Sequence, residues 1–384
     1  MQGFIREEVM KNTWLYKKES YLHLTDILSF KPTLVIIFLI AIVSALPSLG
    51  MSNKEVKESM KTYVYKTIDN LEIKADVYRL DGDDIRPVIF WMHGGALIGG
   101  SRTGIPPTAQ LERYLASGYV LVSIDYRLAP ETKLKGIIED VEDAYAWVRN
   151  HGPNLFNIDP NRIAVMGMSA GGYLTLTSGF RFKPSPNALV ALYGYGDITG
   201  PWTSEPKPAM LKLPLVSREE AMQGVNQPAI ANTDSLTEDQ LKQRGLFGTY
   251  VMQNGLWAQE VSGRNVKTEP EWFKNYEARQ NVNSNYPPTM LLHGEKDNDT
   301  LFSQIVLMAE ELKRHNVEYQ FITQPHWQHG FDLLDDPVNQ EKIIQSVGGP
   351  EKMEEMGMDL PLPNDPTIKD AHNKIIIFLD KHLK

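Results

Sequence analysis

Short runs of apolar residues recur along the chain and predict buried strands. PVIFWMH at 87–93 is such a run, typical of a strand covered on both faces of a sheet. Residues 62–80 instead alternate around Asp69-Asn70, which predicts a β-hairpin. Further strands are expected at 119–127, 162–168, 188–194, 288–294 and 319–323.

Segments with helical spacing separate these strands. Residues 136–150 place Ile137, Val141, Ala144, Tyr145 and Val148 on one helical face. Other helices are expected at 107–117, 301–315 and 367–383. Because strand and helix alternate through most of the chain, the pattern predicts an α/β fold, with a mainly parallel central sheet and helices on both faces.

Two segments interrupt this rhythm. Residues 200–286 contain no clear buried strand and are rich in Trp, Met, Gln and Asn. They are interpreted as an inserted helical cap, with helical pieces near 217–224, 237–254 and 269–281. Residues 335–366 contain Gly and Pro breaks and a Met-rich patch, which predicts a surface excursion before the last helix.

The N-terminal region has a different character. No charged residue occurs at 32–53, the apolar centre is LVIIFLIAIVSAL, and lysines precede it. This pattern is typical of a secretory signal, with small residues suited to cleavage near Ala45 or Gly50, although the leader is unusually long. Met10 as the true start, an uncleaved membrane anchor and a buried hairpin are the alternatives.

The expected organisation follows from that reading. Residues 1–54 are expected to form a signal peptide or membrane anchor, and residues 55–384 a single α/β domain with its cap at about 200–286. The protein is then expected to be secreted or extracytoplasmic, or anchored to a membrane through residues 32–53.

Composition narrows the classes of function. The chain has 384 residues, 42% of them hydrophobic, which suffices for a large core. Its net charge of −9 without a Lys/Arg block argues against nucleic-acid binding. Because cysteine is absent, there is no disulfide, thiolate metal site or cysteine nucleophile. Oligomeric state leaves no signal in the sequence.

GMSAG at 167–171 matches the pattern G-x-S-x-G. Such a match arises by chance in about one chain of this length in ten. Here it follows an apolar strand and precedes a helix start made of small residues, the strand–turn–helix setting of a nucleophile elbow. Ser169 is therefore the candidate nucleophile, and the Ala170 N–H faces the reacting carbonyl. A glycine-rich turn with a serine N-cap is the alternative.

A serine hydroxyl needs a base and an acid that orients the base. HWQHGF follows the last expected strand and offers His329, which is favoured, and His326. LLHGEKDNDT follows the strand before it, and there Asp297 is favoured as the orienting acid over Glu295 and Asp299. The resulting order of serine, acid and histidine is that of the nucleophile-elbow enzymes.

A fourth stretch supplies candidate oxyanion donors. In WMHGGALIGG a strand ends directly in His-Gly-Gly-Ala. Glycines let backbone N–H groups approach a developing oxyanion closely. Gly95 and Ala96, with Gly94 shaping the turn, are expected to join Ala170 in an oxyanion hole. His93 is interpreted as structural.

Taken in order, HGG, DYRLAPE, GMSAGG, HGEKD and HG resemble the hormone-sensitive-lipase-like branch of the α/β-hydrolase fold over about residues 60–333. The resemblance implies serine carboxylester hydrolysis without a metal or organic cofactor. Two departures stand out. Ala96 replaces a third glycine, which implies a narrower acyl pocket, and TKLKG follows DYRLAPE in place of an aromatic-proline pair. Asp125, Arg127 and Glu131 are interpreted as a structural ion-pair and turn cluster.

The sequence thus predicts an esterase that acts on a small-molecule ester. Tryptophans of the cap are candidates for apolar pocket walls or for cap core: Trp202, Trp257 and Trp272. The same triad could cleave an amide, as in formamidase-like or prolyl-oligopeptidase-like relatives, and an inactive surface-binding module is a more distant alternative. The chain contains no spacing typical of a metal site, a P-loop or a dinucleotide fingerprint.

Overall fold

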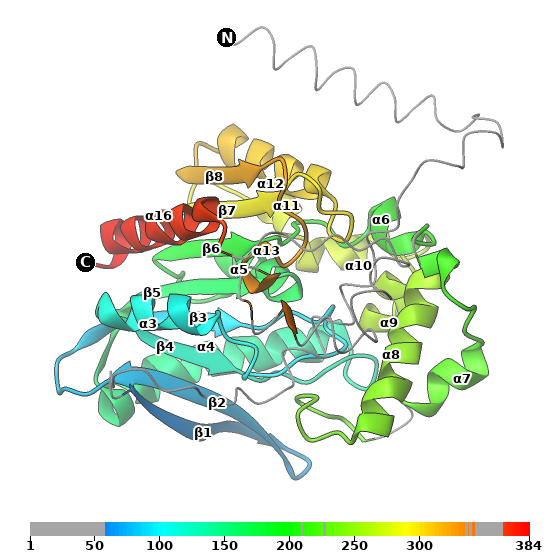
Figure 1. Ribbon diagram of the computed structural model, residues 1–384, viewed down its shortest axis with the longest axis horizontal. Coiled ribbons are helices and arrows are strands. Elements are labelled where there is room, and N and C mark those ends of the chain that lie inside the picture. Colours follow the sequence, from blue (N-terminus) through cyan, green and yellow to red (C-terminus); the bar gives the residue numbers. More distant parts are fainter. Residues whose placement is uncertain (1–57, 209, 226–227, 335–336, 338–339, 342–363) are drawn as a thin grey trace, which may run out of the picture. The chain divides into compact units, whose positions relative to one another are not determined.

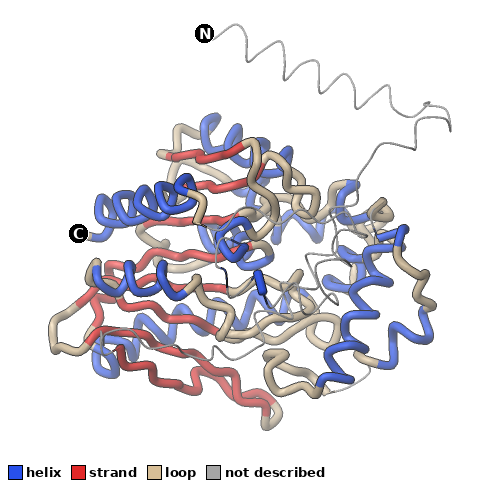
Figure 2. The backbone as a smooth tube through the Cα atoms, in the orientation of Figure 1, coloured by secondary structure: helices blue, strands red, loops and turns tan. Residues whose placement is uncertain are grey.

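The computed structural model describes residues 58–384 except 209, 226–227, 335–336, 338–339 and 342–363 (Figures 1 and 2). The expected signal or anchor segment lies outside the described residues, as does most of the expected surface excursion at 335–366, so both stay predictions. Among the helices that the structure describes, none combines the length and apolar character needed to cross a membrane.

Eight strands form one sheet in the order β1-β2-β4-β3-β5-β6-β7-β8 (Figure 1). Strands β1 and β2 pair antiparallel, as do β2 and β4, and all other neighbours are parallel. The mainly parallel sheet predicted from the sequence is confirmed. The bounds are β1 Glu58–Ile68, β2 Leu71–Leu80, β3 Arg86–Met92, β4 Val120–Ile124, β5 Ile158–Met168, β6 Ala188–Leu192, β7 Thr289–Gly294 and β8 Tyr319–Gln324.

The β1–β2 hairpin turns at Asp69 and Asn70, where the sequence predicts it. Both residues have positive φ, 47° and 70°. Two consecutive residues with positive φ make a turn whose twist matches that of the flanking strands, and Asp and Asn tolerate this conformation better than most residues.

Each central strand buries both faces because successive side chains point in opposite directions. In β3, Val88 and Phe90 pack into the core on one side of the sheet, whereas Ile89 and Trp91 pack into the core on the other. All four side chains are fully buried. This explains why the strand reads as a continuous apolar run.

Helices cover both faces of the sheet (Figures 1 and 2). On one face α4, α5 and α12 contribute buried residues to the same core as Val88, and on the other α3 and α16 pack with Ile89. Helix α4 continues past the predicted end at 150 through Pro153 to Phe156. The bounds are α3 Thr108–Ala116, α4 Leu134–Phe156, α5 Ala170–Arg181, α12 Phe302–Arg314, α13 Phe331–Leu334 and α16 Pro366–Leu383.

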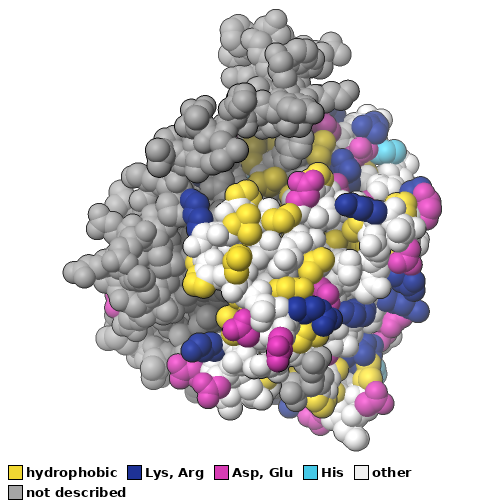
Figure 3. Space-filling view, turned by 90° about the vertical axis from the view of Figure 1, so that its right-hand side faces the viewer, with side chains coloured by type: hydrophobic (Ala, Val, Ile, Leu, Met, Phe, Trp, Pro, Cys, Tyr) yellow, Lys and Arg dark blue, Asp and Glu magenta, His cyan; other side chains and the backbone are white. Residues whose placement is uncertain are grey.

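The chain between β6 and β7, here called the cap, carries the helices α6 to α11, and Figure 1 shows α7, α8 and α9 together beyond the carboxyl ends of the parallel strands. Figure 3 looks onto this side, where apolar side chains lie among charged ones. The bounds are α6 Pro201–Ser204, η2 Met210–Lys212, α7 Arg218–Gln223, α8 Glu238–Gln253, α9 Trp257–Ser262, α10 Pro270–Phe273, η3 Lys274–Tyr276 and α11 Ala278–Asn281.

One cap element differs from its prediction. The helical piece expected at 269–281 is divided, because Glu277 adopts an extended backbone with φ −107° and ψ 108°. Its buried carboxylate accepts hydrogen bonds from the Thr199 hydroxyl, at 2.5 Å, and from the Ile198 N–H. This tie between the chain after β6 and the chain before β7 has no local sequence signature.

Candidate active site

Ser169 lies in the turn between β5 and α5. Its φ of 55° and ψ of −119° form a strained conformation that a non-glycine residue rarely adopts. The flanking glycines make the turn sterically feasible, because a Cβ at Gly167 or at Gly171 would overlap the carbonyl oxygen of Met92. The hydroxyl is thereby presented beyond the carboxyl end of a central strand.

His329 connects Ser169 with Asp297. Its Nε2 lies 3.0 Å from Ser169 Oγ, and its Nδ1 lies 2.8 Å from Asp297 Oδ2. Ser169 follows β5, Asp297 follows β7 and His329 follows β8. The three side chains therefore meet beyond the carboxyl ends of three parallel strands. With Nδ1–H donating to the carboxylate, Nε2 is free to accept the hydroxyl proton.

Asp297 is held as a carboxylate by several donors. Its Oδ1 accepts the N–H groups of Asp299 and Thr300 at 2.8 and 2.9 Å. His293 Nε2 lies 3.2 Å from Oδ2. Burial alone would raise the pKa of Asp297, but the charge of His329 and the hydrogen bonds from both histidines outweigh it, so the pKa lies well below its usual range.

The same pair sets the ionisation of His329. Burial opposes a charged imidazolium and lowers the pKa of His329, but the charge and hydrogen bond of Asp297 outweigh burial, so the pKa is raised above 6.5. Tyr193 packs edge-on against the His329 ring, with the two ring centroids 4.8 Å apart. The ring is thus fixed by contacts on two sides.

The rival residues from the sequence lie elsewhere. His326 Nε2 contacts Asp365 Oδ2 at 2.6 Å, and its side chain is 48% exposed. Glu295 accepts a hydrogen bond from the Thr323 hydroxyl. Asp299 faces Lys207 rather than the imidazole. Of the candidates weighed, the structure brings Ser169 together with His329 and Asp297.

The loop after β3 carries three of the four predicted oxyanion residues, Gly94, Gly95 and Ala96. Gly94 lies against Ser169, since a Cβ placed on Gly94 would be 3.2 Å from that of Ser169. Gly95 and Ala96 have φ of 106° and 55°. Among the described residues, neither Gly95 nor Ala96 donates its N–H to a backbone carbonyl. With its φ of 55°, Ala96 adopts the left-handed conformation that glycine usually supplies.

His93 supports this loop from beneath. Its ring stacks on Tyr126 with centroids 4.2 Å apart, and its Nδ1 lies 2.7 Å from the Gly94 carbonyl oxygen. Burial lowers the pKa of His93 to about 4, so the ring is neutral at pH 7. The prediction that His93 is structural agrees with these contacts.

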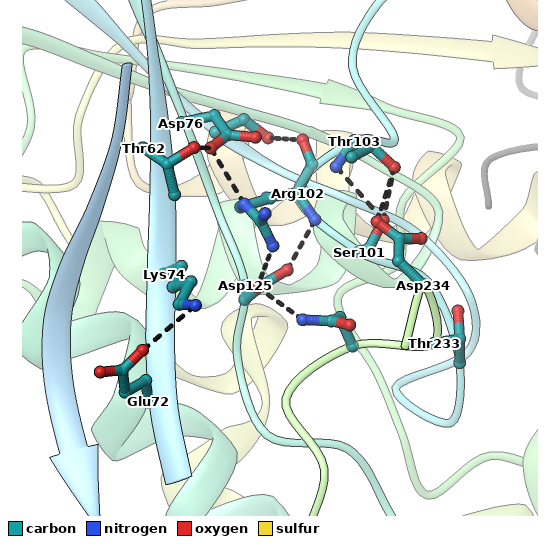
Figure 4. A network of polar contacts seen from close by, with 12 residues as sticks. Thr62, Glu72, Lys74, Asp76, Ser101, Arg102, Thr103, Asp125, Thr233 and Asp234 are labelled. Atoms are coloured by element: carbon teal, nitrogen blue, oxygen red, sulfur yellow. Dashed lines mark hydrogen bonds and ion pairs between the residues drawn. The ribbon is translucent and has the colours of Figure 1, made fainter. Parts of the chain in front are cut away.

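The far end of the loop is anchored by charge. Figure 4 shows Arg102 between Asp76 and Asp125, with Nε–Oδ1 3.0 Å and Nη1–Oδ2 2.8 Å. The Arg102 N–H also donates to Asp125, and so does the Asn232 amide from the cap. Each charged residue singled out in DYRLAPE lies in an ion pair, although not with the other two: Asp125 pairs with Arg102, Arg127 with Asp140, and Glu131 with Arg244.

The cap contacts the loop directly. Trp257 Nε1 donates to the Ala96 carbonyl at 2.9 Å, and Arg244 Nε donates to the Ile98 carbonyl at 2.6 Å. Arg244 also forms a two-point ion pair with Glu131, and the two side chains are each 4% exposed. Cap and oxyanion loop therefore form one hydrogen-bonded unit.

Replacing Arg244 with Met should lower the free energy of unfolding by about 3–5 kcal/mol, because Glu131 is left as an unpaired buried charge. Urea unfolding followed by circular dichroism measures this loss. The double variant Arg244→Met, Glu131→Gln should recover part of it, because no charge remains buried. An equally large loss in Arg218→Ala, an exposed arginine of α7, would contradict this account.

A pocket opens beside Ser169 and His329. Its walls come from the oxyanion loop, the cap and the chain after β7. Apolar lining is supplied by Tyr195, Trp202, Met252 and Trp257. Polar lining is supplied by Thr203, Lys207, Asp299 and Thr300.

A family model described as the alpha/beta hydrolase fold matches residues 89–333. The chain belongs to the α/β-hydrolase family. Membership supports hydrolase activity, and it agrees with the resemblance drawn from HGG, DYRLAPE and GMSAGG.

The curated relatives of this hydrolase are parts of much larger proteins. It is 36% identical over 162 residues to "Non-reducing polyketide synthase mapC'" of Penicillium brevicompactum, covering 38% of this chain and 7% of that protein. To mapC of the same fungus it is 29% identical over 320 residues, covering 71% of this chain and 13% of that protein. The hydrolase thus spans only a small part of these relatives.

Solved structures share the fold at low identity. A protein of unknown function from Staphylococcus aureus superposes with a TM-score of 0.61 at 20% identity, covering 84% of this chain and all of that one. An esterase from Pyrobaculum calidifontis gives 0.56 at 22%, covering 90% and 89%. A structure titled "Bacterial Heroin Esterase" gives 0.57 at 18%, covering 87% of each chain.

Several residues of the site were not predicted from the sequence of the hydrolase. Lys207 and Met252 reach the pocket from the cap, and His293 supports Asp297 from inside β7. A signal was available only for His293, which lies four residues before Asp297 in HGEKD. Trp202 and Trp257 line the pocket as anticipated, but Trp272 does not: it packs on Tyr276, with ring centroids 4.3 Å apart.

Within the described parts of the hydrolase, no three His, Asp or Glu side chains gather in a way that could hold a metal ion. The histidines near the site are engaged otherwise: His329 and His293 contact Asp297, and His93 contacts the oxyanion loop.

Proposed function

We propose that this α/β-hydrolase cleaves carboxylic esters through a serine acyl-enzyme. The observation that carries the proposal is the continuous set of contacts from Ser169 Oγ through His329 to Asp297, at 3.0 and 2.8 Å. The strained serine turn and the neighbouring loop with unused N–H groups support it.

In the proposed first half-reaction, Ser169 Oγ attacks the ester carbonyl carbon while His329 Nε2 accepts the hydroxyl proton. Asp297 stabilises the imidazolium that forms. The negative charge on the carbonyl oxygen is met by the N–H groups of Ala170, Gly95 and Ala96. His329 then gives the proton to the leaving alkoxide oxygen, and the alcohol departs.

In the second half-reaction, water attacks the acyl carbon and gives a proton to His329 Nε2. The same N–H groups stabilise the second oxyanion. Collapse of this intermediate breaks the bond to Ser169 Oγ, which takes the proton back from His329 as the carboxylic acid leaves. No redox partner or cofactor is needed for either step.

A substrate panel tests the proposal. p-Nitrophenyl esters should be hydrolysed with values of kcat/KM well above those for the matching anilides, because an alkoxide or phenoxide leaves more readily than an amine. The acyl-enzyme should appear as a mass increase on Ser169 with a slowly hydrolysed ester. Preferential cleavage of the anilides would instead support an amidase.

Replacing Asp297 with Asn should lower kcat by about 10⁴-fold, because the imidazole loses the group that fixes its tautomer. His329 must be neutral to act as base, so activity rises with pH through its pKa. In the wild type this limb should lie above pH 6.5, because Asp297 raises the pKa of His329 against burial. In the variant the charge of Asp297 no longer opposes burial, so the pKa of His329 falls and the limb should move to lower pH.

The pH dependence of kcat/KM measures both effects. Glu295→Gln is the matched control, because Glu295 lies on the same loop but contacts Thr323, and it should keep the wild-type rate and profile. A profile in Asp297→Asn that rises at the wild-type pH would show that Asp297 does not act on His329.

A further inference from the structure

The polar residues on the cap side of the pocket take no part in the proposed catalytic steps. Lys207 Nζ donates to the Asp299 carbonyl at 2.9 Å and lies 3.3 Å from Asp299 Oδ1. The two side chains are 12% and 4% exposed. Because burying a lysine and an aspartate removes both from water, a pair placed here is costly unless it makes further contacts.

Hydrogen-bonding capacity remains unused at this pair. Asp299 Oδ2 and Trp202 Nε1 are buried, and neither has a partner among the described residues. An ammonium group has three N–H donors, and two of those on Lys207 are directed at Asp299. Lys207, Asp299 and Trp202 all line the pocket, and together they hold one acceptor and two donors without a partner in the described part of the chain, whereas buried polar atoms are normally paired.

The charges select among the groups that could pair with these atoms. A carboxylate would be repelled by Asp299, and an ammonium would be repelled by Lys207. A hydroxyl is neutral, donates one hydrogen bond and accepts others. It can donate to Asp299 Oδ2 and accept from Lys207 or Trp202 at the same time.

We propose that this hydrolase takes neutral esters that carry a hydroxyl group close to the ester bond, and that Lys207, Asp299 and Trp202 bind this hydroxyl. The proposal rests on the proposed esterase function. The hydroxyl must lie close to the ester bond because Ser169 and Lys207 line the same pocket. Trp202 and Trp257, whose rings lie 27° from parallel, supply an apolar wall for the carbon atoms between.

Two pairs of substrates test the proposal on the two sides of the ester. The first pair compares p-nitrophenyl 3-hydroxybutyrate, which carries the hydroxyl on its acyl group, with p-nitrophenyl butyrate. The second pair compares glycerol monobutyrate, which carries the hydroxyl on its alcohol, with propyl butyrate. For the wild type, kcat/KM should be about tenfold or more higher for the hydroxylated member of one pair, because an ester without the hydroxyl leaves the buried polar groups of the pocket unpaired.

Lys207→Met and, separately, Asp299→Asn should reduce that preference to about twofold or less. The ratio within a pair is the decisive quantity, because both esters use the same serine and histidine, and a changed pKa of His329 affects them equally. Lys212→Met is the matched control, an exposed lysine of the same cap, and it should keep the wild-type ratio.

The proposal is overturned if the wild type shows no preference in either pair, which is the result expected if the free atoms hold only water. It is also overturned if the ratio persists in both Lys207→Met and Asp299→Asn. These failures differ from a failure of the esterase function, in which p-nitrophenyl butyrate itself would not be hydrolysed and Ser169 would not be acylated.

Discussion

Replacing Ser169 with Ala should lower kcat/KM for p-nitrophenyl butyrate by about 10⁴-fold or more. The reason is geometric: Ser169 Oγ is the atom that His329 Nε2 contacts at 3.0 Å, and alanine has no atom there to attack the ester. The remaining rate should come from the oxyanion donors and the pocket, which the substitution leaves in place.

The fold should survive this change. Alanine at position 169 keeps the strained φ of 55°, so no contact of the core is lost. Thermal unfolding should therefore be close to that of the wild type. Ser235→Ala, at an exposed serine of the cap, is the control and should keep full activity.

A covalent label separates a lost nucleophile from a distorted site. A fluorophosphonate probe should modify the wild type and Ser235→Ala at Ser169 and leave Ser169→Ala unlabelled. Full esterase activity in Ser169→Ala would falsify the serine mechanism.

The fold could be predicted from the sequence because the patterns that indicate its strands and turns are local. A strand covered on both faces, such as β3, must be a continuous apolar run, since each residue contacts one core or the other. The serine turn is local as well: Gly167, Ser169 and Gly171 lie within five positions, and the steric reason for both glycines lies in the adjoining strand.

The lining of the pocket could not be predicted from the sequence, because its residues meet only through the tertiary fold. Lys207 and Asp299 are 92 positions apart, and nothing near either residue in the sequence indicates the other. Trp257 reaches the Ala96 carbonyl across 161 positions. The cap helices could be predicted from spacing, but the face that each turns toward the site depends on packing.

Ala96 shows a different limit of sequence reasoning. The sequence predicts Ala96 as an oxyanion donor in place of a glycine, and the structure adds what this change demands: a non-glycine residue at φ 55°, followed by Leu97 at φ 60°. Two such residues in succession cost free energy, on the order of 1–2 kcal/mol each. The contacts from Trp257 and Arg244 to this loop offset part of that cost.

The two histidines of HWQHGF present the sharpest choice that the sequence left open. Both lie after β8 and are three positions apart, so strand position alone does not separate them. What separates them is the direction of the two side chains: that of His326 contacts Asp365, the N-cap residue of α16, and that of His329 contacts Asp297.

Replacing His329 with Ala should lower kcat by about 10⁴- to 10⁶-fold, because no other described side chain is placed to accept the Ser169 proton. Replacing His326 with Ala should leave kcat near the wild-type value, since the contacts that are lost, with Asp365 and with the Trp327 ring, do not involve Ser169 or Asp297. Steady-state hydrolysis of p-nitrophenyl butyrate by both variants measures the difference.

Added imidazole should restore part of the rate to His329→Ala, because the vacated space lies between Ser169 and Asp297. Loss of activity in His326→Ala with retention in His329→Ala would assign the base to the other histidine, whatever the distances in the folded chain.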